Sequence, residues 1–451
     1  MRMRSRATRA VSESWGSVVS LLMPPGYREP ATRRRRMTPG DTRGATISVM
    51  RIVTPIKLVA FTVLALVAAA TAWGLIALWP DYDQVAKTAD RAPLVAEGTT
   101  FETGELLAVT EGCAEVDGST ADDCLTFSIG IRSGDDAGHV VDITARGAVT
   151  RAGLQPGDRL ELMAYPHAPV AETRYQLANQ YSVSGVFRGL PLAILALVFV
   201  AVVIAVGRLR GLLALLALGI SAAVILAFLL PALVAGSPGL LVGVIASSAI
   251  MFTILYLVHG FNMRTTSALV GTLCGIAIMA GVSLIAAQAT RLSGIGDEAS
   301  GTLAGVVEHI DFRGLLSCSV IIAGLGILND VTITQASSVW ELRAAAPAMP
   351  RHEVYASAMR IGRDHIASTV YTVFFAYVGA ALGVLILLYL YDRPLLSLLT
   401  HEDIAIEVVR TLCGSIGLVL AVPITTWAAV CFAPPPSTTA AASPAETAPS
   451  V

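Results

Sequence analysis

The chain has 451 residues, of which 54% are hydrophobic and 14% are charged, and its mean hydropathy is +0.68. Soluble domains carry about 25% charged residues, so the composition excludes an ordinary soluble protein and indicates a polytopic membrane protein. The formal net charge of −2 identifies no partner, because the charges of a membrane protein are sorted between the two sides of the bilayer. The lipid bilayer is therefore the first predicted partner.

The N-terminal part of the chain divides into a polar extension and an apolar segment. Residues 1–50 are rich in arginine and proline and predict a disordered extension; alternatively, translation starts later, at Met37 or Met50. Residues 58–79 form a long apolar segment without a clear A-x-A cleavage site, which is typical of an uncleaved signal anchor. Arg51 and Lys57 precede it and place its start in the cytoplasm.

Residues 80–188 form a long polar segment that follows the anchor. About five short runs of alternating polarity, separated by turn signals at 134–136 and 155–158, predict a small all-β domain outside the cytoplasm. We expect an OB-like barrel, with a β-sandwich fragment as the alternative. The segment is rich in Asp and Glu and lacks a basic patch with interleaved aromatic residues, so we expect no nucleic-acid binding.

Two of the six cysteines lie in this polar segment. Cys113 and Cys124 flank the acidic loop AEVDGSTADD. A disulfide between them is expected if the domain lies outside the cytoplasm, and two free thiols are the alternative. The other cysteines lie in apolar segments, where cysteine behaves as a small hydrophobic residue.

The remainder of the chain, residues 190–432, predicts a helical transmembrane bundle of about seven spans. The predicted spans are 190–206, 212–233, 240–258, 268–287, 315–334, 369–391 and 411–432. With the signal anchor, the fold class is a polytopic α-helical membrane protein of about eight transmembrane helices with an inserted small all-β domain. Residues 433–451 are rich in Pro, Ala, Ser and Thr and predict a disordered tail.

The loops of this bundle carry an arginine bias. The loops assigned to the inner side hold more arginines than the outer loops after the β domain, which places both termini in the cytoplasm. Glycine pairs at GxxxG spacing, 239/243, 271/275 and 379/383, indicate close packing between helices.

The strongest functional signal is a group of polar residues in the predicted span 315–334. This polar cluster consists of Asn329, Asp330, Thr332, Thr334 and Gln335. If the helix enters the bilayer near Leu315, Asp330 lies about 22 Å further along, past the middle of a hydrocarbon core roughly 30 Å thick. A carboxylate at that depth usually faces a partner, a cavity or an ion path. Asp330 and Thr334 share one helical face, and Asn329 and Thr332 lie on an adjacent face.

Two plainer interpretations of the cluster remain open. The span could end near Leu328, which would leave these residues at the cytoplasmic interface. They could also form hydrogen bonds between helices and serve assembly.

A weaker candidate site lies in the predicted outer loop before the same span. Glu308, His309 and Asp311 could together bind a divalent metal. A solvated loop is the simpler interpretation, and we predict no metal site and no cofactor. His352-Glu353 does not continue to H-E-x-x-H, and neither G-x-S-x-G nor a P-loop occurs, so we expect no enzymatic activity.

Three stretches resemble the YibE/F family of bacterial multi-pass membrane proteins. They are GILNDVTITQASSVWELR at 326–343, LYLVHGFNMRTTSALVGTL at 255–273 and HIDFRGLL at 309–316. The similarity extends over roughly residues 95–432 and implies an outer β domain followed by a helical bundle in a bacterial cell membrane. The family is defined by its membrane architecture, so the resemblance implies no particular substrate.

Two functional hypotheses follow. The first is a permease-like protein whose bundle holds a polar path near Asp330 for an unidentified small solute or ion, with the β domain as an outer cap. The second is a non-catalytic assembly or sensing protein whose outer domain binds an envelope partner or ligand. A homo-oligomer or an envelope protein partner is compatible with both hypotheses.

Overall fold

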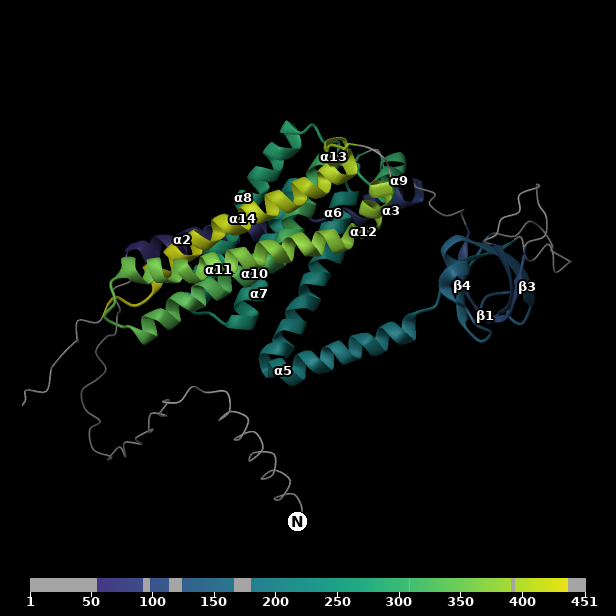
Figure 1. Ribbon diagram of the computed structural model, residues 1–451, viewed down its shortest axis with the longest axis horizontal. Helices are drawn as coiled ribbons and strands as arrows, with labels where there is room; N and C mark the ends of the chain where they lie inside the picture. The colour runs from purple at the N-terminus through teal and green to yellow at the C-terminus, as the bar shows by residue number, and fades with distance from the viewer. Residues whose placement is uncertain are drawn as a thin grey trace, which may run out of the picture. The chain divides into compact units, whose positions relative to one another are not determined.

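The structure of the protein is a computed structural model that describes residues 55–91, 98–112, 124–165, 180–307, 309–390 and 394–436. It contains a five-stranded antiparallel sheet and a set of long apolar helices (Figure 1). The predicted extension at residues 1–50, together with Cys113, Glu308 and the tail from residue 437, lies outside the described residues.

The helices account for most of the described chain. They are α2 (Pro55–Ala77), α3 (Tyr82–Arg91), α5 (Gly189–Val224), the π-helical turn η2 (Ile225–Leu229), α6 (Leu230–Val234), α7 (Gly239–His259), α8 (Met263–Ala289), α9 (Glu298–Val306), α10 (Phe312–Ala345), α11 (Arg351–Ala380), α12 (Leu382–Leu390), α13 (Leu395–Leu399) and α14 (Glu402–Phe432). Among the described residues, six helical segments are long and apolar enough to cross a membrane, or up to seven if the bent pair α11–α12 forms one span. This pattern indicates a helical membrane protein; the count of about eight spans stays a prediction.

The longest apolar segment, Gly189–Val234, has 46 residues and would be about 69 Å long if straight, more than twice the hydrocarbon thickness. It is bent at Arg208, where φ is 54° and ψ is −133° (Figure 1). A Cβ at Gly211 would collide with the carbonyl oxygen of Val203, so glycine permits the tight approach after the bend. The bend falls where the sequence predicted a loop between two spans.

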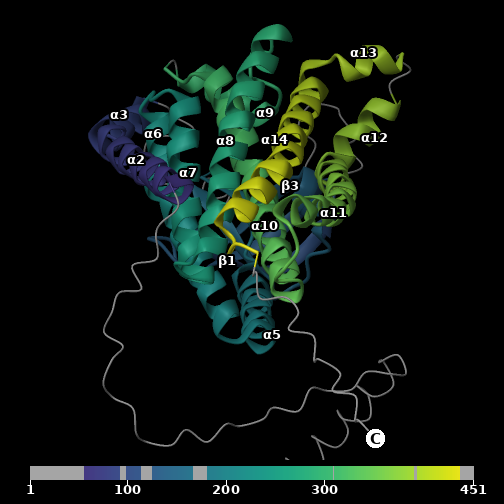
Figure 2. The same cartoon turned by 90° about the vertical axis from the view of Figure 1, so that its left-hand side faces the viewer.

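Helices α8, α10 and α14 pack against one another at the centre of the bundle, and α7 and α11 flank them (Figure 2). Small residues allow this approach. A Cβ at Gly271 of α8 would collide with the Thr425 side chain of α14, and one at Gly275 would lie 2.6 Å from Leu328 of α10. Close packing at this predicted GxxxG pair is therefore confirmed.

The other two glycine pairs differ from each other. A Cβ at Gly239 would collide with the backbone of Gly314, and one at Gly243 would lie 3.0 Å from Cys318, so this pair also packs closely on α10. Gly379 and Gly383 have no other described atom within 4 Å of such a Cβ. The spacing alone did not distinguish a packed pair from an open one.

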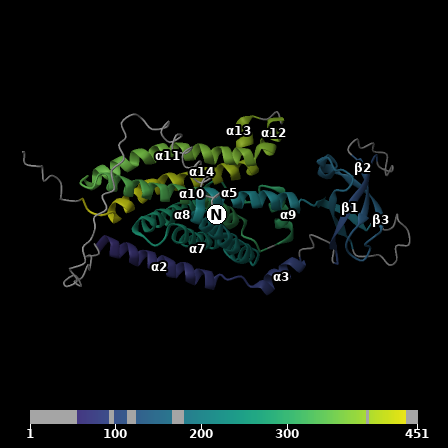
Figure 3. The same ribbon diagram turned by 90° about the horizontal axis from the view of Figure 1, so that it is seen from below.

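The predicted all-β segment contains a curved antiparallel sheet (Figure 3). Its strands are β1 (Thr100–Glu111), β2 (Cys124–Ile131), β3 (Val140–Arg146), β4 (Arg159–Ala164) and β5 (Tyr181–Val186), in the order β3-β2-β1-β4-β5. Alternate residues of β3 are buried, and one face of the sheet carries an apolar core that includes Leu106, Phe127 and Leu160. β1 is irregular between Leu106 and Ala108, which adds to the curvature of the sheet.

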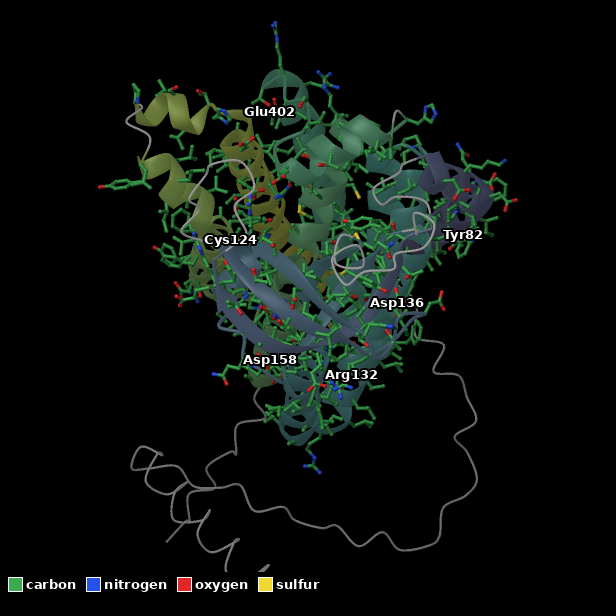
Figure 4. All side chains as sticks on the ribbon, turned by 90° about the vertical axis from the view of Figure 1, so that its right-hand side faces the viewer. Tyr82, Cys124, Arg132, Asp136, Asp158 and Glu402 are labelled. Atoms are coloured by element: carbon green, nitrogen blue, oxygen red, sulfur yellow. The ribbon has the colours of Figure 1, made fainter. Side chains whose placement is uncertain are left out.

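The sequence did not predict α3, a short helix between the anchor helix and the sheet. The Tyr82 hydroxyl at its start, labelled in Figure 4, donates a hydrogen bond of 2.6 Å to the carbonyl oxygen of Ala227. The residue four positions after Ala227 is Pro231, which has no N–H to offer that oxygen. Tyr82 therefore satisfies an acceptor that the proline leaves open, and this contact attaches α3 to the bundle.

Candidate functional site

The polar cluster lies near the middle of α10. The helix does not end near Leu328 but continues to Ala345. α10 has 34 residues, so Asp330 lies about 27 Å from its first residue and about 22 Å from its last. The Asp311 carboxylate caps the start of the helix by accepting a 2.9 Å hydrogen bond from the Gly314 N–H. At the other end, the buried Arg343 guanidinium donates to the Met349 carbonyl at 2.6 Å. The first contact caps the start of α10, and the second attaches the end of α10 to the loop that follows it.

One face of the cluster points into the bundle. Thr332 is 0% exposed, and its hydroxyl lies 2.7 Å from the hydroxyl of Thr272 on α8. Gln335 is 2% exposed; its amide nitrogen donates to the Ala358 carbonyl of α11 at 2.9 Å and to the Thr426 hydroxyl of α14 at 2.8 Å. The interpretation as interhelical hydrogen bonding therefore applies to Thr332 and Gln335.

The other face of the cluster is open. The Asp330 side chain is 68% exposed, and its carboxylate lies 4.0 Å from Nε2 of His365, whose side chain is 33% exposed. The Thr334 hydroxyl lies 3.5 Å from the same nitrogen. Asp330 and Thr334 share a face as predicted, and the structure adds His365 of α11. We call these three residues the open polar face.

Sequence analysis missed His365 because it is far from Asp330 along the chain. α10 and α11 form an antiparallel hairpin around residues 346–350, and Asp330 and His365 lie nearly the same distance from that loop. In an antiparallel hairpin, residues at equal distances from the loop lie side by side, so the hairpin places Asp330 next to His365. This pairing can be predicted only when the start of α11, at Arg351, is known.

Asn329 lies between the two faces and is half-buried. Within the described part of the chain, its Oδ1 atom is buried and has no hydrogen-bond partner. A buried acceptor without a partner costs about 1–3 kcal/mol. Its position beside Asp330 is therefore suited to a water molecule or a polar solute.

Of the weaker candidate site, the structure describes His309 and Asp311 but not Glu308. His309 is exposed, and Asp311 is used as the cap of α10. Over the ranges that the structure describes, no group of three or more His, Cys, Asp or Glu side chains could hold a metal ion. Glu402, the first residue of α14 (labelled in Figure 4), accepts hydrogen bonds from the backbone and the hydroxyl of Ser293 in the loop after α8, at 2.6 and 2.5 Å.

The β domain has a polar pocket of its own. A cavity of about 410 Å³ is lined by Thr103, Gly104, Glu105, Arg132, Arg159 and Phe187. Arg132 is held there by an ion pair of 2.6 Å with Glu105. Cys124 is buried and disulfide-bonded; the predicted pairing with Cys113 stays a prediction, because Cys113 is not described.

The apolar helices indicate a helical membrane protein, and the same chain contains a five-stranded antiparallel sheet. The family model described as YibE/F-like protein matches residues 195–435. Since this range is more than half of the chain, the protein belongs to the YibE/F-like family. The matched range includes Asp330 and His365 and leaves the β sheet outside. No curated protein and no solved structure matches the chain.

Proposed function

We propose that this YibE/F-like protein is a permease and that the open polar face of α10 and α11 lines its route for a small solute or ion. The observation that carries the proposal is the Asp330 carboxylate, which is 68% exposed in the middle of a helix long and apolar enough to span a membrane. An ionised carboxylate facing lipid near the bilayer centre costs about 2.5–3.5 kcal/mol or more. A water-filled route removes most of this cost.

The different surroundings of the two polar faces of α10 support the proposal. The Thr332 and Gln335 contacts fix α10 against three other helices, so that the neighbouring Asp330 is presented on a rigid support. The buried Asn329 oxygen adds an acceptor beside the same route. In the proposed orientation, both termini are cytoplasmic, the membrane is a bacterial cell membrane, and residues 80–188 form an outer cap.

A complementation experiment tests this function. A deletion strain would be grown on a panel of solutes and stresses to find its phenotypes, and then complemented with variants of this chain. We expect Asp330→Asn and His365→Gln to fail in complementation while remaining in the membrane at wild-type levels. Ser338→Ala, about two turns beyond Asp330 on α10, is the matched control. Full complementation of every phenotype by both variants would refute the permease hypothesis.

A second function, envelope assembly or sensing through the β domain, is favoured by the polar pocket around Arg132. An OB-like barrel is our proposal for this domain, supported by the strand order and by the contact between the edge strands β3 and β5. Replacing residues 98–186 with a short flexible linker separates the functions. The sensing function predicts complete loss of complementation, whereas a permease with a dispensable cap retains part of it.

A further inference from the structure

A second group of ionisable side chains lies where α11 meets α14, away from the polar cluster. Glu407 and Arg410 of α14 form an ion pair one turn apart, and their side chains are 32% and 25% exposed. Tyr377 of α11 lies within electrostatic range of both charges. All three residues belong to helices that are long and apolar enough to span a membrane, if α11 and α12 are counted together.

Tyr377 and Glu407 border an apolar pocket at the break between α11 and α12. The pocket has a volume of about 290 Å³, and its lining includes Phe374, Tyr377, Leu385, Leu399, Glu407 and Thr411. Glu407 is the one charged residue of its described lining. The helix axis turns by 67° between α11 and α12, directly beside this pocket. A carboxylate is thus kept at the edge of apolar surroundings where the neighbouring helix is interrupted.

The site around Asp330 and His365 and the site around Tyr377 and Glu407 lie at different heights along α11. Tyr377 is about 18 Å further along α11 than His365, from the helical rise per residue. At the height of His365, α10 and α14 bury an apolar cluster that includes Val331, Leu418 and Val422. α14 carries no charged residue after Arg410. Two separate ionisable sites therefore lie at different heights along α11.

We propose that Tyr377, Glu407 and Arg410 form a second ionisable site of the route and that the ion exchanged there is the proton. The proposal rests on the proposed function, because it assigns an ion to the route that contains Asp330. A proton binds to a single carboxylate oxygen, whereas a metal cation needs several ligands, and the described residues contain no group of three or more His, Cys, Asp or Glu side chains that could hold one.

Proton binding changes the contacts of the site in a definite way. A proton taken up by Glu407 gives a neutral acid that suits the apolar pocket, and it breaks the ion pair with Arg410. Release of the proton restores the pair. Other ionisable groups near the pair are the Tyr377 hydroxyl from α11, Asp297 before α9, which lies within electrostatic range of Arg410, and Asp403, one turn before Glu407 on α14. α12 and α13 contribute apolar residues to the pocket.

Carbodiimide labelling of the wild-type protein tests the site itself. Dicyclohexylcarbodiimide adds to a protonated carboxylic acid in apolar surroundings and leaves a stable N-acylurea, with no atom lost. We expect peptide mass spectrometry of the full chain to show labelling of Glu407 at acidic pH that declines as the pH rises. Arg410→Gln should raise labelling at neutral pH, because the ion pair no longer favours the carboxylate. Labelling of Glu407 at or below that of the exposed Glu298 at every pH would overturn the proposal.

Charge movement after a pH jump tests the role of the proton. The full chain would be reconstituted in phosphatidylethanolamine/phosphatidylglycerol vesicles on a solid-supported membrane. Wild type and Glu298→Gln should give a transient current, and Glu407→Gln should lose it. A wild type without a transient, or a Glu407→Gln variant with the wild-type transient, would overturn the proposal. If Glu407→Gln is not monodisperse, the labelling of the wild-type chain decides.

The failure of this inference can be distinguished from failure of the proposed function. Complementation by Asp330→Asn tests the route without reference to protons. If Asp330→Asn fails to complement and Glu407 is neither labelled nor required for charge movement, the route stands and the second site is overturned. If Asp330→Asn complements fully, the proposed function falls and this inference falls with it.

Discussion

Two faces of α10 carry polar side chains within one turn of each other, and the structure gives them opposite surroundings. Thr332 and Gln335 are buried and have hydrogen-bond partners on neighbouring helices. Asp330 and Thr334 are exposed, with His365 as their neighbour. The comparison teaches that polarity within a span does not define a role. Buried hydrogen bonds to other helices indicate assembly, whereas an exposed carboxylate such as Asp330, 4.0 Å from the partly exposed His365, indicates contact with solute or solvent.

The largest expected effect on stability is that of Gln335→Leu. The change removes two hydrogen bonds and leaves the Ala358 carbonyl and the Thr426 hydroxyl without the amide donor. We expect a loss of about 2 kcal/mol in the free energy of unfolding. Denaturation in detergent micelles, monitored by circular dichroism, would measure it. A loss no larger than that of Ser338→Ala would break the comparison, because the interior face would then contribute nothing to assembly.

A smaller loss is expected for Thr332→Val, which keeps the shape of the side chain and removes the hydroxyl that faces Thr272. We expect about 1 kcal/mol. A double-mutant cycle with Thr272→Val should show coupling, because the second change removes a contact that is already lost. Strict additivity of the two losses would show that the hydroxyls do not stabilise the bundle through each other.

Asp330→Asn tests the exposed face of α10, where we expect little effect on stability. The carboxylate is 68% exposed and caps no helix, so the free energy of unfolding should change by less than about 0.5 kcal/mol. Complementation should nevertheless fail. A large loss of stability in the same denaturation assay would show that Asp330 stabilises the bundle, as Thr332 and Gln335 do.

The smallest effect is expected at Asp297, a polar contact outside the spans. Its carboxylate accepts a hydrogen bond of 2.6 Å from the Ser300 N–H and caps α9. The hydrogen bonds with Ser300 lower the pKa of Asp297 below its ordinary value of 3.8. A lowered folded-state pKa gives stability that is present above pH 3.8 and is lost as the pH falls through the folded-state value. Hydrogen exchange in α9 should therefore accelerate under acid, and Asp297→Asn should remove this acceleration. The same acceleration of hydrogen exchange under acid in the Asp297→Asn variant would contradict the role of the Asp297 carboxylate.

The sequence predicted the general architecture because hydropathy and alternation are local signals. The apolar segments became helices, the alternating segment became a sheet, and the expected loop near Arg208 became a bend. The period of 3.6 residues also placed Asp330 and Thr334 on one face. These features require no knowledge of distant contacts.

The parts that sequence analysis missed depend on distant contacts. His365 reaches Asp330 from another helix, and Gln335 finds partners on α11 and α14. α3 was missed because it has only 10 residues and a polar composition, and the Pro231 that helps attach it lies far along the chain. A pattern within a single segment cannot identify which helices become neighbours.

The most direct test of the division between the two faces is thiol accessibility at adjacent positions. Asp330→Cys and Thr332→Cys would be introduced into a chain whose span cysteines, Cys274, Cys318, Cys413 and Cys431, are replaced by alanine. Intact cells and inverted vesicles would be treated with a small membrane-impermeant thiol reagent, with Ala348→Cys in the loop after α10 as the control. We predict that position 330 is labelled more slowly than the loop and that position 332 is unlabelled. Equal labelling of positions 330 and 332, or no labelling at either, would contradict the assignment of Asp330 to a water-filled route.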